Sequence, residues 1–253
     1  SAIALAAPEE YDFDGALAGV TWAHLTGITP SLSENAYLST LGLAQRAKAA
    51  GACVSCDLNF RKKLWNWRPP ATSKELAREC MSEILPHVDL VIGNEEDAAD
   101  VLGIEAEGTS VEEGRINAAA YEQVAREIAA RFPTVSRVGI TLRESLSADH
   151  NNWGGMLFDV ATDRAYFAPT DESGEYRSYE IRDIVDRVGG GDSFAAGLIF
   201  ALTGEEYAAP DLAIRFAVAA SCLKHSVKGD FSFVTLDEVQ ALVGGAASGR
   251  VRR

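Results

Sequence analysis

The stretch that decides the fold is Ile184–Leu202, which reads IVDRVGGGDSFAAGLIFAL. An apolar run is interrupted by Gly189, Gly190 and Gly191 and by one acid, Asp192. Apolar residues then recur at the spacing of one helix face, so we expect a helix to begin at the glycines. Glycines let the backbone approach a ligand closely, and a helix N-terminus directs N–H groups and its positive dipole end at an anion such as a phosphate. An acid inside such an anion site is expected to accept a proton.

The same stretch has a simpler interpretation. Consecutive glycines can form a turn without further function, and an aspartate at a helix start is commonly an N-cap. The spacing matches neither the GxGxxG of dinucleotide-binding folds nor the P-loop with its Lys-Ser/Thr. From the pattern alone, an anion site and a plain helix start both stay open.

Length and composition are those of one soluble globular domain over residues 1–253, with 47% hydrophobic and 24% charged residues. The net charge of −14 argues against binding to nucleic acid or an anionic membrane, because the long-range field is repulsive. No apolar run approaches the roughly 20 residues of a membrane span. Cys53 and Cys56 form a CxxC in an apolar segment without a second pair for zinc, so we expect buried, reduced thiols in a cytoplasmic protein.

Strand and helix patterns alternate from Val20 to Leu142, which predicts a layered α/β fold with a mainly parallel sheet. The predicted strands are Ser1–Ala7, Val20–Leu25, Ala52–Leu58, Asp89–Gly93, Val135–Leu142 and a hairpin of Met156–Val160 with Arg164–Phe167. The predicted helices are Asp12–Ala18, Ser33–Ala50 with Leu38, Leu41 and Ala44 on one face, Ser73–Leu85, Asn94–Leu102, Ala118–Arg131, Asp211–Lys228 and Leu236–Val243. Glu105–Gly114 and Arg143–Gly155 are expected to be surface loops.

Polar clusters follow the ends of the predicted strands, at Asp57–Arg61, Gly93–Asp97, Thr141–Ser145 and Gly189–Asp192. In open parallel sheets ligands bind at the carboxyl ends of the strands, so these clusters are expected to form one site. An anion site that carries an acid suits phosphoryl transfer to a hydroxyl, with the acid taking the hydroxyl proton.

Two further groups fit this chemistry, and each has a plainer interpretation. Asn94 and the acids beside it could hold Mg²⁺ through water, since this ion prefers oxygen ligands and keeps much of its hydration. The same acids would also favour the first turn of a helix. Arg61 is suited to bind a carboxylate or phosphate in a fork, although it can equally be a solvated surface side chain.

The segment Asp186–Phe194 resembles the C-terminal signature of the ribokinase-like, phosphofructokinase-B type carbohydrate kinases, which usually reads Asp-Thr-x-Gly-Ala-Gly-Asp. Its Arg-Val-Gly-Gly version, together with Asp57–Trp65, is similar to the 2-keto-3-deoxygluconate kinases within that family. Gly27–Pro30 and Thr141–Ser145 fit the same branch. The resemblance extends over essentially the whole chain and implies a three-layer α/β/α sandwich with a mainly parallel central sheet.

This resemblance implies ATP-dependent phosphorylation of the primary hydroxyl of a sugar acid, 2-keto-3-deoxygluconate to its 6-phosphate, with Mg²⁺ and, in some members, a monovalent cation such as K⁺. It makes Asp192 the catalytic base and Gly189, Gly190 and Gly191 the anion hole. The implied substrate residues are Arg61, Asp192 and Asp230. The implied nucleotide residues are Asn59, Asn94, Thr141, Arg143, Ser145, Gly189 and Gly191, and Asn94 and Asp97 would approach a metal through water.

The chain departs from the family pattern at two places. Members usually carry Asn-x-x-Glu where this chain has Asp97 as the fourth residue. Members also have further βα units and a small β-sheet lid upstream, so residues 1–7 are expected to be the last lid strand, and a homo-oligomer would form through the missing part. Two alternatives stay open: a kinase for a neutral sugar or nucleoside of the fructose, ribose or adenosine type, and a non-catalytic ligand-binding relative.

Overall fold

The computed structural model describes residues 1–105, 117–147 and 149–244. Contacts divide these residues into two compact units. The first unit holds residues 1–105, 117–139 and 160–163, and the second holds 140–147, 149–159 and 164–244. No helix among the described residues combines the length and the apolar character that a bilayer crossing requires.

The first unit is built on parallel strands. β1 (Trp22–Thr26) pairs with β2 (Cys53–Asp57), and β2 pairs with β3 (Leu90–Gly93), both in parallel. The first residues of β4 (Arg137–Ser145) come next, because the Arg137 amide donates to the Asp89 carbonyl at 3.1 Å. The centres of β2 and β3 are buried, and apart from Ser55 they are apolar, as is typical of parallel strands, so the predicted parallel sheet is confirmed.

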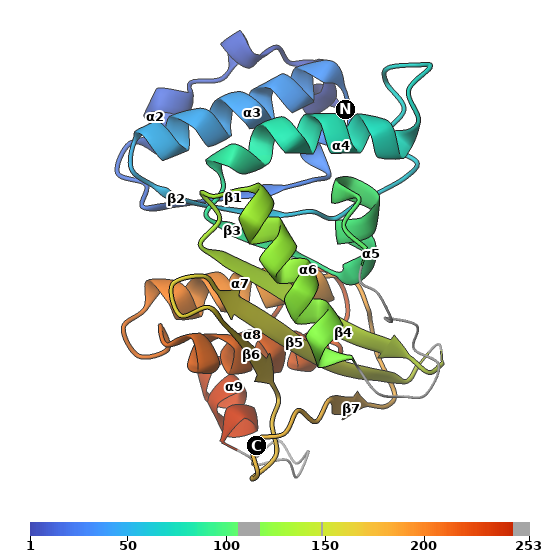
Figure 1. The fold of residues 1–253 in the computed structure, drawn as a ribbon, viewed down its shortest axis with the longest axis vertical. Coiled ribbons are helices and arrows are strands. Elements are labelled where there is room, and N and C mark those ends of the chain that lie inside the picture. Colours follow the sequence, from blue (N-terminus) through green and yellow to red (C-terminus); the bar gives the residue numbers. More distant parts are fainter. Residues whose placement is uncertain (106–116, 148, 245–253) are drawn as a thin grey trace. The chain divides into compact units, whose positions relative to one another are not determined.

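The helices of the first unit begin and end largely where capping residues predict. They are α1 (Ala2–Leu5), α2 (Phe13–Leu17), α3 (Glu34–Ala49), α4 (Ser73–Ile84), α5 (Glu95–Asp97) with a π turn at Ala98–Leu102, and α6 (Ala118–Arg131). The predicted cap Ser33 accepts the Ala36 amide at 3.1 Å, and Thr72 caps α4. α3 packs on β1 and β2 and lies beside α4 (Figure 1).

Two predictions for this unit are wrong. Residues 1–7, expected as a strand, contain the helix α1, whose alanines favour helix over strand. Leu38 is 42% exposed, so it does not face the core as the apolar spacing predicted. The buried side of α3 instead carries small or polar residues with one tyrosine: Ala36, Tyr37, Ser39, Thr40, Ala44 and Ala47.

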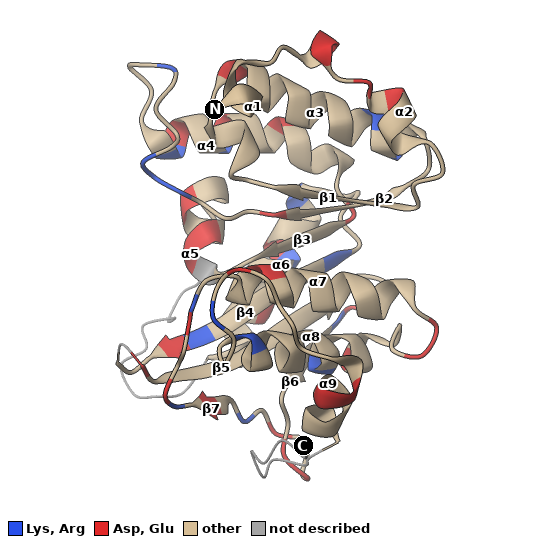
Figure 2. Ribbon diagram, turned by 180° about the vertical axis from the view of Figure 1, so that it is seen from behind, with Lys and Arg blue, Asp and Glu red and all other residues tan. Residues whose placement is uncertain are grey.

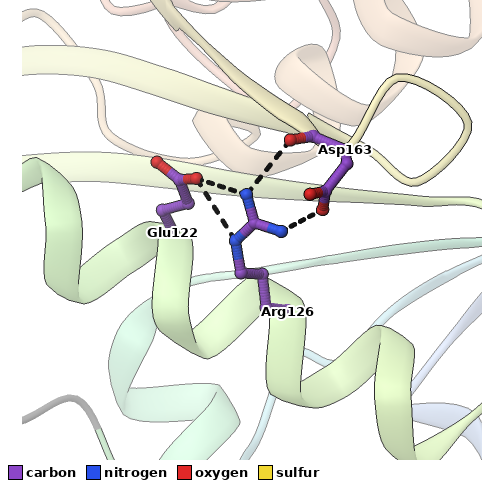
Figure 3. Close-up of polar contacts among 3 residues, drawn as sticks. All are labelled: Glu122, Arg126 and Asp163. Carbon is purple, nitrogen blue, oxygen red and sulfur yellow. Dashed lines mark hydrogen bonds and ion pairs between the residues drawn. The ribbon is translucent and has the colours of Figure 1, made fainter.

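The turn of the predicted hairpin also belongs to the first unit. Asp163 adopts φ +53, and its carbonyl oxygen accepts a hydrogen bond from Arg126 of α6 at 3.1 Å. Arg126 pairs with the Asp163 carboxylate as well and with Glu122 one turn earlier, so it lies between two acids (Figure 3). α6 therefore holds the turn at the predicted position.

The second unit combines antiparallel strands with the last three helices. β5 (Asn151–Asp159) pairs with β6 (Arg164–Ala168) and with β7 (Tyr179–Ile181), both antiparallel, and this confirms the predicted hairpin. The helices are α7 (Gly190–Thr203), α8 (Pro210–Lys224) and α9 (Leu236–Val243). α8 packs on α7 and α9 and against β5 and β6 (Figure 1).

The predicted loop at Arg143–Gly155 is wrong, because β4 continues to Ser145 and β5 begins at Asn151. Leu142 and Glu144 are buried and alternate with exposed residues, which is the period of a strand. The Glu144 carboxylate is satisfied by the Asn152 side-chain amide at 2.8 Å, so an acid that suggests a loop can be buried here. Most of the second predicted loop, Glu105–Gly114, lies outside the described residues.

All four cysteines are free thiols. Cys56 is buried, and Cys53 is half-buried, with burial raising the pKa of the Cys53 thiol to about 11. A thiol with a raised pKa carries little reactive thiolate at neutral pH. The predicted pair of reduced thiols is present, although only Cys56 is fully buried.

Candidate functional site

The glycine turn opens α7, as predicted. Gly189 has φ +78, and a Cβ there would lie 2.6 Å from the Asp230 carbonyl oxygen, so only glycine fits. A Cβ on Gly190 would lie 3.1 Å from the His225 ring, which is also tight. A Cβ on Gly191 would meet no atom within 4 Å. Gly189 is therefore required by packing, Gly190 has little room for a side chain, and Gly191 borders open space.

Asp192 lies exposed in the first turn of α7. The N-cap of this helix is Gly189, and no side-chain cap hydrogen bond is present. The alternative that Asp192 serves as the N-cap is therefore wrong. An exposed carboxylate beside open space at a helix N-terminus is free of that structural role and accessible to a ligand.

The C-terminal end of α8 and the segment after it stabilise the turn by hydrogen bonds. The Ser221 hydroxyl donates to the Gly190 carbonyl at 2.6 Å. The Asp186 carboxylate accepts the amides of Val188 at 3.0 Å and Gly229 at 2.8 Å, which ties the turn to the segment after α8. These bonds fix the backbone of the turn before any ligand binds.

Cations gather beside the turn in an otherwise acidic chain. Burial lowers the pKa of His225, whose ring packs against Gly190, and nearby positive charges lower it further. Those charges belong to Lys224, Arg187 and Arg143. Figure 2 shows basic residues along β4 and beside α8. Positive charge therefore lies near the turn in a chain whose net charge is −14, beside the carboxylates of Asp186 and Asp192.

The predicted nucleotide residues of β4 share one face of the strand. Thr141 is half-buried, and Arg143 and Ser145 are exposed, while Leu142 and Glu144 point to the buried side. The charge of Arg143 contributes to the lowered pKa of His225, whose ring packs against Gly190. The predicted substrate residue Asp230 also approaches the turn, through its carbonyl oxygen beside Gly189.

A second cluster of predicted residues lies in the first unit, where β2 and β3 end. The Asp97 carboxylate accepts the Phe60 amide at 2.9 Å and the Asn94 amide at 3.3 Å. The Asn94 side-chain oxygen accepts the Asp97 amide at 2.7 Å. The Asn59–Arg61 and Asn94–Asp97 segments therefore lie together, as the strand-end argument predicts within this unit. Arg61 is exposed and donates to the Phe60 carbonyl at 3.0 Å.

The Asp97 carboxylate already has partners within the protein. Both carboxylate oxygens of Asp97 accept backbone amides, and the residue is only 8% exposed. Among the described residues, no three or more His, Cys, Asp or Glu side chains gather as metal ligands would. The expectation that Asn94 and Asp97 approach a metal through water stays a prediction.

Sequence reasoning missed three residues of α8 and its end, namely Ser221, Lys224 and His225, which pack beneath the glycine turn. Lys224 is fully buried, and its ammonium donates to the Val227 carbonyl at 3.0 Å. The available signal was a lysine at the helical spacing of the buried residues Ala217 and Ser221.

No protein-family model matches the chain. The crystal structure of 2-dehydro-3-deoxygluconokinase from Thermotoga maritima superposes with a TM-score of 0.82 at 39% identity, over 97% of this chain and 66% of that one. The chain belongs to the ribokinase-like, PfkB-type carbohydrate kinases. The predicted family and the predicted α/β fold are thereby confirmed.

Two further relatives of this kinase family agree. A PfkB family carbohydrate kinase from Listeria grayi has a TM-score of 0.75 at 27% identity, over 93% of this chain and 63% of that one. The 2-dehydro-3-deoxygalactonokinase of Haloferax volcanii is 28% identical over 249 residues, which are 98% of this chain and 65% of that protein. The chain thus spans about two thirds of the length of the relatives it matches.

Proposed function

We propose that the protein is an ATP-dependent carbohydrate kinase that phosphorylates the primary hydroxyl of a sugar acid, with 2-keto-3-deoxygluconate as substrate. The observation that carries this proposal is the glycine turn of α7, which combines open space at Gly191, nearby cations and an exposed acid, Asp192. The names of the Thermotoga and Haloferax relatives support a sugar acid as the substrate class.

In the proposed reaction, Asp192 accepts the proton of the sugar hydroxyl while the hydroxyl oxygen attacks the γ-phosphorus of ATP. A new O–P bond forms, the bond from the γ-phosphorus to the bridging oxygen breaks, and ADP leaves. The amides at the start of α7 hold the transferring phosphoryl group, and Arg143, Arg187 and Lys224 favour its negative charge. Mg²⁺ supplied with the nucleotide neutralises phosphate charge in such reactions.

Arg61 is proposed to bind the carboxylate of the sugar acid. Its guanidinium is exposed at the end of β2 and can form a bidentate pair with a carboxylate. A neutral sugar has no carboxylate, so Arg61 distinguishes the sugar-acid kinase from a kinase of the fructose or ribose type. A monovalent-cation requirement, assembly into a homo-oligomer and a cytoplasmic location stay predictions.

The test is coupled ADP release by the purified protein on 2-keto-3-deoxygluconate and on fructose. We expect turnover on the keto acid, a loss of about 10²–10⁴ in kcat for Asp192→Asn with nearly unchanged ATP binding, and a KM effect of Arg61→Ala confined to the keto acid. A kcat near the wild-type value in Asp192→Asn would overturn the mechanism. Turnover on fructose alone would establish a neutral-sugar kinase, and ATP binding without turnover on any sugar would favour a non-catalytic relative.

A further inference from the structure

Asp97 is a buried acid that the proposed reaction does not use. Acids are rarely buried unless their oxygens are satisfied, because desolvation penalises the charge. Burial raises the pKa of Asp97 despite the amides that bind it and despite the nearby charge of Arg61. Burying this carboxylate therefore costs folding free energy, and we ask which interaction of Asp97 offsets that cost.

The hydrogen bonds of Asp97 connect two strand ends that are distant in the sequence. One carboxylate oxygen accepts from Phe60, 37 positions away, and the other accepts from Asn94. The amide of Asp97 in turn donates to the Asn94 side chain. A single side chain thus links the segment after β2 to the segment after β3.

The segment after β2 needs such a link. Asn59 has φ +34, in the left-handed region, which asparagine adopts more readily than most residues but which costs more than the extended or helical regions. The next amide along the chain is that of Phe60, which Asp97 binds at 2.9 Å. Arg61 follows directly, so the position of its guanidinium depends on the same few backbone torsions.

We propose that Asp97 is a positioning residue: it binds the Phe60 amide to hold Asn59-Phe60-Arg61 in the conformation that presents Arg61 to the substrate carboxylate. This inference rests on the proposed function in its choice of substrate group. It gives Asp97 a role in holding the backbone, in which the short aspartate side chain binds both the Phe60 amide and the Asn94 amide.

Asp97→Asn is the informative variant, because it keeps the shape and removes the charge. The Asn amide oxygen can still accept one backbone N–H, but its NH₂ group would face the other, so one of the two bonds is lost. Asp100→Asn is the matched control, because Asp100 lies one turn later and pairs with Lys74. Asp97→Glu is a second variant that keeps the charge and displaces the oxygens.

The first measurement is hydrogen exchange of the amides around Phe60, which needs no substrate. We expect about tenfold faster exchange there in Asp97→Asn and no change in Asp100→Asn. Unchanged exchange in Asp97→Asn and Asp97→Glu would overturn the link. This result stands even if the protein proves inactive on sugar acids, so the two proposals can fail separately.

The second measurement is a double-mutant cycle on the KM for the keto acid. We expect Asp97→Asn to raise this KM about tenfold and to have little further effect once Arg61→Ala is present, because both changes remove the same contact. The KM for ATP should change less than the KM for the keto acid. Fully additive effects of the two variants would show that Asp97 does not act through Arg61.

Discussion

A substitution at Gly191 should affect the proposed reaction without lowering the stability of the fold. A Cβ on Gly191 meets no atom within 4 Å, whereas a Cβ on Gly189 would lie 2.6 Å from the Asp230 carbonyl oxygen at φ +78. Gly191→Ala should therefore fold normally. Alanine is favoured over glycine in a helix by about 0.5–1 kcal/mol, so the variant should unfold at the same or a slightly higher temperature than the parent, by about 1–4 °C.

The same methyl group should be harmful to the reaction. It would fill the open space at the start of α7, where the amides are proposed to hold the transferring phosphoryl group. If the methyl group keeps the phosphoryl group away from one of these amides, the cost should match the loss of one such donor, which is typically about 10²–10³ in kcat. We expect kcat to fall at least about 100-fold, a change that runs opposite to the change in stability.

Thermal unfolding and coupled ADP release on three alanine variants test this reasoning. Gly204→Ala is the control, since Gly204 ends the same helix and its Cβ would make an ordinary 3.5 Å contact with the Phe200 carbonyl. Gly189→Ala should lose at least about 1–3 kcal/mol of stability from its strained backbone. A wild-type kcat in Gly191→Ala would refute the anion site. A clearly lower unfolding temperature of that variant would show that the space around Gly191 is not open.

Two further predictions concern the supports of the turn. Lys224→Met keeps the buried stem but removes the ammonium, so the Val227 carbonyl loses its donor. We therefore expect the free energy of unfolding, measured by chemical denaturation, to fall by about 1–3 kcal/mol, and kcat, measured by ADP release, to fall severalfold. An unchanged kcat would mean that Lys224 supports only the fold. Hydrogen bonds from the Val188 and Gly229 amides lower the pKa of Asp186 below 3.8, so its contribution to stability is present above pH 3.8 and is lost as pH falls through the lowered value. The difference in melting temperature between wild type and Asp186→Asn should therefore vanish in acid, and a difference that persists there would contradict this assignment.

Local sequence patterns predicted the helices and strands whose type does not depend on contacts with distant residues. The predicted strand Ala52–Leu58 contains β2, and the spacing of Phe194 and Leu198 predicted the core-facing side of α7, where both are fully buried. The predictions failed where the structure of a segment depends on a contact with another strand or helix. Glu144 is buried because Asn152 binds it, and no pattern within the predicted loop shows that bond.

The candidate site divides in the same way. Asp192 and the glycines could be proposed from the sequence because their expected chemistry depends on adjacent residues at a helix start. Ser221 and Lys224 were missed because they act through a helix that packs beneath the turn. Asp97 was noticed as an oxygen ligand, but its partner at Phe60 is a backbone amide from another strand end, which a sequence does not show.

In each unit a buried polar side chain binds a backbone group of a segment that is proposed to face a ligand, Asp97 at Phe60 and Ser221 at Gly190. The side chains proposed to touch ligands, Arg61 and Asp192, are exposed and contribute little to packing. This division of labour predicts two classes of variant: changes to the exposed residues should alter kinetics and leave stability intact, whereas changes to the buried residues should alter both. Because the buried residues act through the backbone, their kinetic effects should disappear when the exposed residue they position has already been removed.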